Sequence, residues 1–432
     1  MEPAPLVGEA FFPLDEQLEL LAGGLTPRAE ETLVRLATWM PYAQAQELLS
    51  DLVGIGVSKA TSRRATLHTG QAALARDEAE EERLKREVPQ APEGADKQQL
   101  SADGAMVHLV GGEWVEVKTL IMGEVTCNKR GEVCTQQLST FSRLADAERF
   151  TQASLVETHR RGLERATAVC AVQDGAEWLQ GFVDYHRADA VRILDFAHAA
   201  EYINEIGQAV QAAGGRLPAT WFEGVLHRLK HQGPERVLKH LAWLAARYPS
   251  PTIQEKLAYL HKREVHMHYP TYQAAGWPIG SGSVENANKV VVEARLKGAG
   301  MRWTRHNVNP MLTLRNAACN RRWHETWQAA RKQRQQSRQQ QRSQRIQTRY
   351  EQALRRLLTL WCKLSAPRPV AEPTPGSASS LAATAAAPPR GPRRPAANHP
   401  WRRPLIVRPT EAPLQKNEPH PKANVCNCLK IE

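Results

Sequence analysis

Apolar residues in the first part of the chain recur three or four positions apart, in two successive runs. The spacing is that of an amphipathic helix. The two runs are Leu33, Leu36, Ala37 and Met40, followed by Ala45, Leu48, Leu49 and Leu52. Gly54 interrupts the second run, and Ser58 is placed to cap a further helix that begins at Lys59. Residues 73–96 are rich in Ala, Glu, Lys and Arg, which predicts an exposed helix or a linker.

The third helix predicted in this region has basic residues near its start. A helix, a Gly-containing turn and a second helix with exposed cations are typical of a helix-turn-helix. The pattern therefore predicts a DNA-recognition unit over residues 28–72, with Arg63 and Arg64 on its contacting helix. A plain helical hairpin has the same pattern, so both interpretations stay open.

From residue 97 the hydrophobic period shortens, which favours strands. The pattern predicts three strands, a helix, a strand, a second helix and a last strand. The predicted strands and the first helix are Leu100 to Asp103, Trp114 to Ile121, Val133 to Phe141, a helix over 146–165, Ala168 to Val172, and Val191 to Asp195. Residues 198–268 return to a helical period and are predicted to form a helical insertion.

Two of these strands are followed by the same dipeptide, Asp-Gly. Asp103 precedes Gly104, and Asp174 precedes Gly175. A single Asp-Gly is most often a turn. Two of them on strands that could be neighbours also suit open carboxylates at the edge of a cleft, which is where Mg²⁺ binds with substrate phosphate oxygens.

A third carboxylate, Glu285, follows the string Gly280-Ser281-Gly282. The glycines allow a tight turn, and Ser283 is placed to cap a helix that begins at Val284. The helix dipole favours a glutamate in a first turn in any case, so a purely structural role is an alternative. Lys289 follows one turn later, on the face where it could reach a phosphate.

Two further segments could serve such a site. Asp195 ends the last predicted strand and His198 follows it, where they could assist at the active edge. For His198, a helix-capping or core role is the alternative. Cations surround one aromatic residue beyond Glu285, a composition suited to docking phosphates or an unpaired base. These residues are Arg295, Lys297, Arg302, Trp303 and Arg305. Packing of the Trp on the core is the alternative.

The segments around these residues resemble a known family. The string from Trp277 to Asn286, and the later Arg-Leu-Lys-Gly-Ala-Gly-Met-Arg-Trp ending at Trp303, are similar to the C-terminal signature of the ISKra-type bacterial insertion-sequence DDE transposases. The segments around Asp103 and Asp174 resemble the first two acidic boxes of that family. The resemblance covers residues 28–327, about 70% of the chain.

The resemblance implies an α/β fold with a ribonuclease H-like mixed sheet, which the predicted order of strands and helices also fits. It implies that Asp103, Asp174 and Glu285 hold two Mg²⁺ or Mn²⁺ ions. In such a site one ion activates water and the other stabilises the leaving 3′ oxygen. The implied activity is cleavage of DNA at the ends of the element and strand transfer into target DNA. The enzyme would work as a homodimer or a higher oligomer on double-stranded DNA, because two ends must be brought together.

The distribution of charge adds a separate region. The chain of 432 residues has a net charge of +12, and residues 331–432 alone contain 20 Lys and Arg against five Asp and Glu. This Arg, Gln and Pro-rich composition predicts a disordered basic tail that suits a polyanion. A solvated extension that only keeps the protein soluble is the alternative. The seven cysteines are scattered and form no Cys-x-x-Cys pair, which fits a reducing compartment. No apolar run is long enough for a membrane span, so we expect a protein of the bacterial cytoplasm or nucleoid that binds no membrane.

The predicted organisation has five regions. They are a helical recognition region with its linker (1–96), the first part of the catalytic core (97–197), the helical insertion (198–270), the part of the core with the Glu285 helix (271–330) and the basic tail (331–432). Two other functions stay open at this point. One is a transposase-derived DNA-binding protein that no longer cuts, and the other is a ribonuclease H-like nuclease that does not join strands.

Overall fold

The structure is a computed structural model that describes residues 25–365. The chain divides into two compact units, at Leu358 and Thr359, and the elements below belong to the first unit except for the end of the last helix. The tail predicted for residues 366–432 lies outside the described part of the chain, as does the start of the predicted recognition region at residues 1–24.

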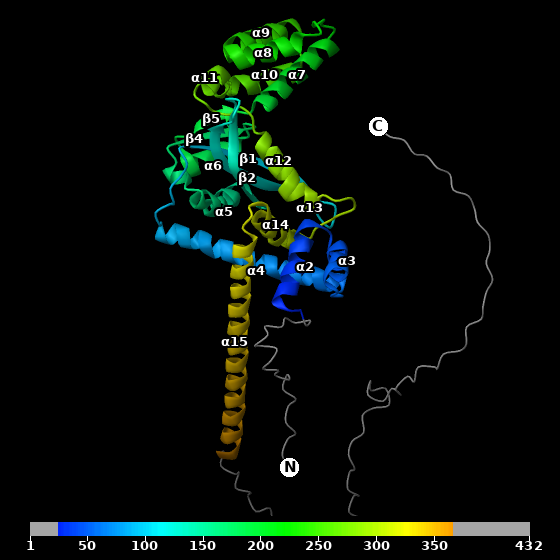
Figure 1. The fold of residues 1–432 in the computed structure, drawn as a ribbon, viewed down its shortest axis with the longest axis vertical. Coiled ribbons are helices and arrows are strands. Elements are labelled where there is room, and N and C mark those ends of the chain that lie inside the picture. The colour runs from blue at the N-terminus through cyan, green and yellow to red at the C-terminus, as the bar shows by residue number, and fades with distance from the viewer. Residues whose placement is uncertain (1–24, 366–432) are drawn as a thin grey trace, which may run out of the picture. The chain divides into compact units, whose positions relative to one another are not determined.

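A five-stranded mixed sheet forms the centre of the fold (Figure 1). Its strands are β1 (Lys97–His108), β2 (Trp114–Cys127), β3 (Val133–Arg143), β4 (Ala168–Gln173) and β5 (Val191–Leu194). They lie in the order β3-β2-β1-β4-β5. Neighbouring strands are antiparallel from β1 to β3, whereas β4 pairs parallel to both β1 and β5. The predicted mixed α/β class and the predicted order of elements are confirmed.

The two faces of the sheet are covered by different helices, because side chains along a strand alternate between faces. On one face Leu100 and Leu120 pack with Phe150 of α5 (Ala147–Arg160) and Phe182 of α6 (Glu177–Arg187). On the other face, strand residues pack against the chain that follows the helical insertion. This second cluster includes Ala105, Val107, Val117, Val291, Leu296, Trp303 and Val308. Asp103 belongs by alternation to the second face.

Three helices precede the sheet, as the hydrophobic period predicts. They are α2 (Pro27–Trp39), α3 (Tyr42–Val53) and α4 (Lys59–Glu87), and Ser58 caps α4 by accepting the N–H of Thr61 at 3.1 Å. The prediction of an exposed helix or linker over 73–96 is wrong for the end of α4. Ala73, Glu81 and Leu84 are buried there, because α4 packs against α5 and against α14 (Arg305–Cys319).

The helical insertion is confirmed between β5 and the chain that bears Glu285. It contains α7 (Phe196–Ala212), α8 (Trp221–Gln232), α9 (Pro234–Arg247), α10 (Pro251–Lys262), the short 3₁₀ turn η2 (Glu264–His266) and α11 (Tyr269–Ala274). Their apolar faces share one core cluster with Val172, Ile193 and Leu194 of the sheet. Figure 1 shows this group of helices beyond the end of the sheet that holds β5.

The chain after the insertion returns to the sheet and then leaves it. It forms α12 (Gly282–Ala287), the π-helical turn η3 (Asn288–Glu293), α13 (Ala294–Leu296), α14 and α15 (Trp323–Ser365). The predicted disordered tail is wrong for residues 331–365, which are helical. Gln and Arg are good helix formers, and the start of α15 is anchored by buried Trp323 and Trp327 and by an ion pair at 2.9 Å between Arg334 and Glu30.

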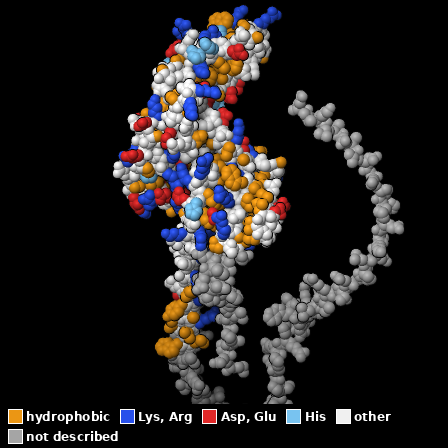
Figure 2. Space-filling model, viewed as in Figure 1, with side chains coloured by type: hydrophobic (Ala, Val, Ile, Leu, Met, Phe, Trp, Pro, Cys, Tyr) orange, Lys and Arg blue, Asp and Glu red, His pale blue; other side chains and the backbone are white. Residues whose placement is uncertain are grey.

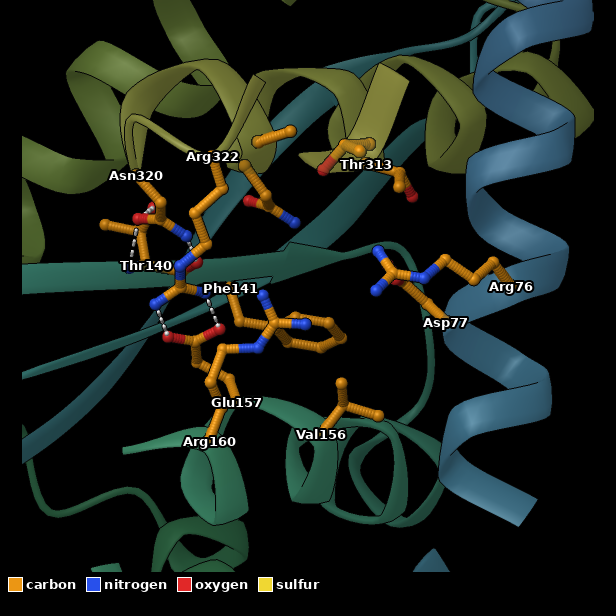
Figure 3. A pocket seen from close by; sticks show the side chains of 13 residues that line it. Arg76, Asp77, Thr140, Phe141, Val156, Glu157, Arg160, Thr313, Asn320 and Arg322 are labelled. Carbon is orange, nitrogen blue, oxygen red and sulfur yellow. Dashed lines mark hydrogen bonds and ion pairs between the residues drawn. The ribbon is translucent and has the colours of Figure 1, made fainter. Parts of the chain in front are cut away.

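Three asparagines cover the free edge of β3, Asn309 and Asn316 from α14 and Asn320 from its C-cap. The backbone N–H groups of Thr140, Ser142 and Leu144 donate to Asn320, Asn316 and Asn309 at 2.8, 3.0 and 2.7 Å. The side-chain amides thus bond edge groups that would otherwise be free to pair with another chain. Figure 3 shows Asn320 on Thr140 beside Arg322, whose guanidinium binds both oxygens of Glu157 at 2.6 and 2.9 Å. These contacts fix α14 and the start of α15 on the sheet.

In the part of the chain that the structure describes, none of the helices is both long and apolar enough to cross a membrane.

Candidate functional site

Asp103 lies within β1 and does not end it. The predicted strand end is wrong because β2 pairs with β1 along its whole length, with Thr119 opposite Asp103 and Lys118 opposite Gly104. A Cβ at Gly104 would meet the flexible side chain of Glu116, which would have to move aside. The Asp-Gly pair is therefore part of the strand and forms no turn.

Asp174 comes level with Asp103 through the pairing of β1 with β4. The parallel register sets Leu100 beside Ala171, and the same offset of 71 positions brings Asp103 level with Asp174 directly after the end of β4. The pKa of the Asp103 carboxyl is raised, first by burial and then by the negative charge of Asp174. The negative charge of Asp174 therefore lies close enough to Asp103 to disfavour ionisation of the Asp103 carboxyl.

Two polar groups counter this effect at Asp103. Its Oδ1 accepts the backbone N–H of Gly104 at 2.7 Å, and its Oδ2 accepts the side-chain amide of Asn288 at 2.9 Å. The electrostatic interaction with His198 lowers the pKa of Asp103 in the same way. Asn288 was not predicted from the sequence. The one feature of the sequence that could have indicated Asn288 is its position three residues after Glu285, on the same helical face.

The helical insertion holds the Asp174 loop in place. Within the loop, Asp174 Oδ1 accepts the N–H of Ala176 at 2.9 Å. From α10 and its end, the Tyr259 hydroxyl donates to the backbone carbonyl of Asp174, and Arg263 Nε donates to the carbonyl of Gly175 at 3.0 Å. The Arg263 guanidinium lies 3.7 Å from the centre of the Tyr259 ring. Both residues are about 85 positions from Asp174, so no local pattern in the sequence indicates their role.

Glu285 lies on α12, which packs across the sheet. Val284 and Ala287 of this helix form a buried cluster with Ile121 of β2. The helix begins at Gly282 after Ser281, so the predicted start at Val284 with a Ser283 cap is wrong. Glu285 itself is exposed, and Asn288, one turn further on, is the residue of this segment that contacts Asp103.

Asp195 positions the chain that leads into α12. It is buried and caps α7, and its Oδ1 accepts the N–H groups of Ala197 and His198 at 2.5 and 3.2 Å. Its second oxygen accepts the N–H of Ser281. Both oxygens are therefore engaged in holding backbone, while His198 Nδ1 lies 3.3 Å from Glu201 Oε2.

The donor set around Asp103 fits a hard divalent cation in part. Asp103, Asp174 and the amide of Asn288 supply the oxygens that Mg²⁺ prefers. The Oδ1 atom of Asn288 is buried and has no hydrogen-bond partner among the described residues. Within residues 25–365, however, no three His, Cys, Asp or Glu side chains are close enough to hold a metal ion together. The structure thus brings together two of the three predicted carboxylates and leaves Glu285 outside that group. The pocket of Figure 3 is lined by none of the three.

The predicted DNA-contacting residues divide into exposed and buried ones. Six are exposed, and two of them already pair with acids, Lys297 with Glu293 at 2.6 Å and Arg305 with Glu113 at 2.7 Å. The exposed set is Arg63, Arg64, Lys289, Lys297, Arg302 and Arg305.

Arg295 and Trp303 lie in the interior, in positions that do not fit the predicted contact with DNA. Arg295 Nε donates to the carbonyl of Ala37 at 2.9 Å, and its guanidinium lies 5.0 Å from the ring centres of both Tyr42 and Trp303. Trp303 forms a β-bridge with Leu109. The pair joins the α2 end of the fold to the sheet.

No protein-family model matches this chain, and neither does any curated protein.

Proposed function

We propose that this chain is a DDE transposase with a ribonuclease H-like core, which cuts DNA at element ends and transfers the freed strand. The observation that carries the proposal is the pair Asp103 and Asp174, level with each other on β1 and after its parallel neighbour β4. The sheet order β3-β2-β1-β4-β5, with only the first three strands antiparallel, supports it. So does the passage of α12 across the face of the sheet to which Asp103 belongs, with Glu285 on that helix.

Asp103, Asp174 and the Asn288 amide oxygen are the groups that would hold Mg²⁺ or Mn²⁺, and Glu285 would serve a second ion. Bound there, the two ions would activate a water molecule and stabilise the leaving 3′ oxygen of a phosphodiester. The chain's own residues prepare the site. Asn288 orients Asp103, and Tyr259 with Arg263 fixes the backbone of Asp174. Burial, and after it the negative charge of Asp174, raises the pKa of Asp103, and a bound cation would favour the ionised carboxylate.

The exposed cations would bind the DNA. Lys289 and Arg302 lie on the segments that follow Glu285, and they would hold phosphates near the cut. Arg63 and Arg64, exposed near the start of α4, would read the ends of the element through a helix-turn-helix formed by α2 to α4. Two such ends must meet, so the working form would be a homodimer or a higher oligomer on double-stranded DNA. Its place would be the bacterial cytoplasm or nucleoid.

One observation favours a second candidate. Glu285 stands outside the group formed by Asp103 and Asp174, which suits a transposase-derived DNA-binding protein that no longer cuts. A ribonuclease H-like nuclease that cuts without joining would use the same two aspartates.

Single substitutions at the three carboxylates test the proposal. Asp103→Asn, Asp174→Asn and Glu285→Gln should each abolish Mg²⁺-dependent cleavage of DNA that flanks the coding sequence, while binding in a gel-shift assay stays nearly unchanged. Glu293→Gln, on the same stretch of helix, is the matched control and should keep full activity. Full cleavage by any of the three variants would remove that residue from the site. If the wild-type protein binds this DNA and does not cleave it, the second candidate is favoured.

A further inference from the structure

The second half of α15 presents apolar side chains to solvent. Ile346 is 60% exposed, Tyr350 69% and Leu357 63%. Leu354 and Leu358 lie beside them and are about half exposed. Figure 2 shows hydrophobic side chains gathered along this part of the helix. In a single copy of the chain these side chains stay in water, so they gain no free energy from burial. A contiguous exposed apolar patch of this kind marks an interaction surface.

The spacing of these residues is that of a coiled-coil seam. Ile346, Tyr350, Ala353 and Leu357 follow one another at intervals of four, three and four residues, and Leu360 continues the pattern in the sequence. This period of 3.5 residues keeps one stripe facing a partner helix along the whole contact.

We propose that this seam, Ile346 to Leu357, pairs in parallel and in register with the seam of a second copy of the chain. The charges beside the seam decide between partners and directions. Arg349 flanks it on one side, and Leu354 flanks it on the other side five positions later. In a parallel pair these two positions face each other across the interface, so Arg349 lies over an apolar residue of the partner. An antiparallel pair would set the Arg349 side of one helix against the Arg349 side of the other, with like charges adjacent.

The remaining candidate within the chain is its own last segment, residues 366–432. That segment is rich in Pro and carries no second run of Leu and Ile at intervals of three and four residues. It therefore lacks the repeat needed to fill a seam of this period. A second copy supplies the matching repeat.

The Arg-rich half of α15 gives the pairing an unusual salt dependence. Residues 331–349 contain no Asp or Glu. In a parallel pair these Arg-rich segments of the two copies lie next to each other, at the same end of the paired helices. Their repulsion opposes pairing at low ionic strength and is screened over about 10 Å at 0.1 M salt. The dimer should therefore tighten as salt rises, whereas pairing through an acidic partner or through DNA would weaken.

Sedimentation velocity of the full chain, free of DNA, tests the proposal. The wild type should show a concentration-dependent monomer–dimer equilibrium that shifts toward dimer at higher salt. Leu357→Lys should weaken the dimer about tenfold or more, because it buries two like charges at facing positions. Gln352→Lys, on the opposite side of α15, adds the same charge and should leave the equilibrium unchanged. An equimolar mixture of Leu357→Lys and Leu357→Glu should restore pairing, since a residue of the seam faces its own copy only in the parallel arrangement.

Each alternative result overturns the proposal. A wild type that stays monomeric at every concentration and salt refutes it, as does a Leu357→Lys variant that dimerises like the Gln352→Lys control. Failure of the mixture to pair refutes the parallel register. Leu357 is exposed in the single chain, so circular dichroism and thermal unfolding should be the same for all variants at protein concentrations low enough to keep the wild type monomeric. The measurement contains no DNA and no metal, so its outcome is separate from that of the proposed cleavage.

Discussion

Gly175, directly after Asp174, should be sensitive to the addition of a single methyl group. Its φ of +81° lies in the left-handed region, and a Cβ at this position would overlap the Arg263 side chain. The substitution Gly175→Ala therefore has two consequences. A left-handed alanine costs the backbone about 1–2 kcal/mol. Displacement of Arg263 also removes its bond to the Gly175 carbonyl, worth about 0.5–1.5 kcal/mol.

The expected loss of free energy of unfolding is thus about 1.5–3.5 kcal/mol for Gly175→Ala. Gly214 offers a matched control, because its φ is +83° and no atom lies within 4 Å of the position of its Cβ. Gly214→Ala should lose only the backbone part, about 1–2 kcal/mol. Urea unfolding followed by circular dichroism measures both values. Cleavage, measured where both variants are folded, should fall in Gly175→Ala alone because the Asp174 backbone shifts.

Equal destabilisation by Gly175→Ala and Gly214→Ala would refute the reasoning that the Arg263 side chain clamps the Asp174 loop. Unchanged cleavage by Gly175→Ala, together with the larger loss of stability, would separate the clamp from any catalytic role of Asp174.

Four further predictions follow from the charges of the chain. Because the pKa of Asp103 is raised in the folded state, its contribution to stability is present at low pH and is lost as the pH rises through the folded-state pKa. Asp103→Asn should therefore gain stability relative to the wild type as the pH rises through this pKa, as measured by urea unfolding. Burial lowers the pKa of His186 to about 4, so wild-type stability should fall by up to about 3 kcal/mol as the pH drops from about 6.5 to 4, a dependence that His186→Gln should flatten. Arg63→Ala or Arg64→Ala should reduce preference for element-end DNA over random DNA by ~1–3 kcal/mol in competition binding, whereas equal weakening on all sequences would assign these residues to phosphates. Deletion of residues 366–432 should lower the slope of log affinity against log salt by ~0.9 for each phosphate that this segment neutralises in the full chain, and an unchanged slope would show that the segment does not engage DNA.

The elements set by local periodicity could be predicted from the sequence. The alternation in β2 and β3 and the helical period of residues 198–268 depend on neighbours a few positions away, and both are confirmed. The strand end expected at Asp103 was wrong for a non-local reason. Asp-Gly favours a turn in isolation, but pairing with β2 on one side carries β1 five residues further.

Only those residues of the candidate site whose positions follow from the order of strands and helices could be predicted from the sequence. Asp103 lies on β1 and Asp174 directly follows β4, and the parallel pairing of these strands follows from the order of elements. Asn288, Tyr259 and Arg263, by contrast, reach the site through contacts between segments about 85 to 185 residues apart. The burial of Arg295 could not be anticipated either. A cation near a candidate site suggests a phosphate contact, but here its partners are a backbone carbonyl and two aromatic rings.

The most direct test of the central claim is one assay on the wild-type protein. The protein is incubated with Mg²⁺, a labelled DNA fragment carrying the sequences that flank the coding region, and a supercoiled target plasmid, and the products are scored for nicks at the fragment ends and for joining to the plasmid. We predict both products, with joining dependent on the freed 3′-OH and blocked when that end is dideoxy-terminated. Nicks without joined products would contradict strand transfer, and specific binding with neither product would contradict the proposed catalysis itself.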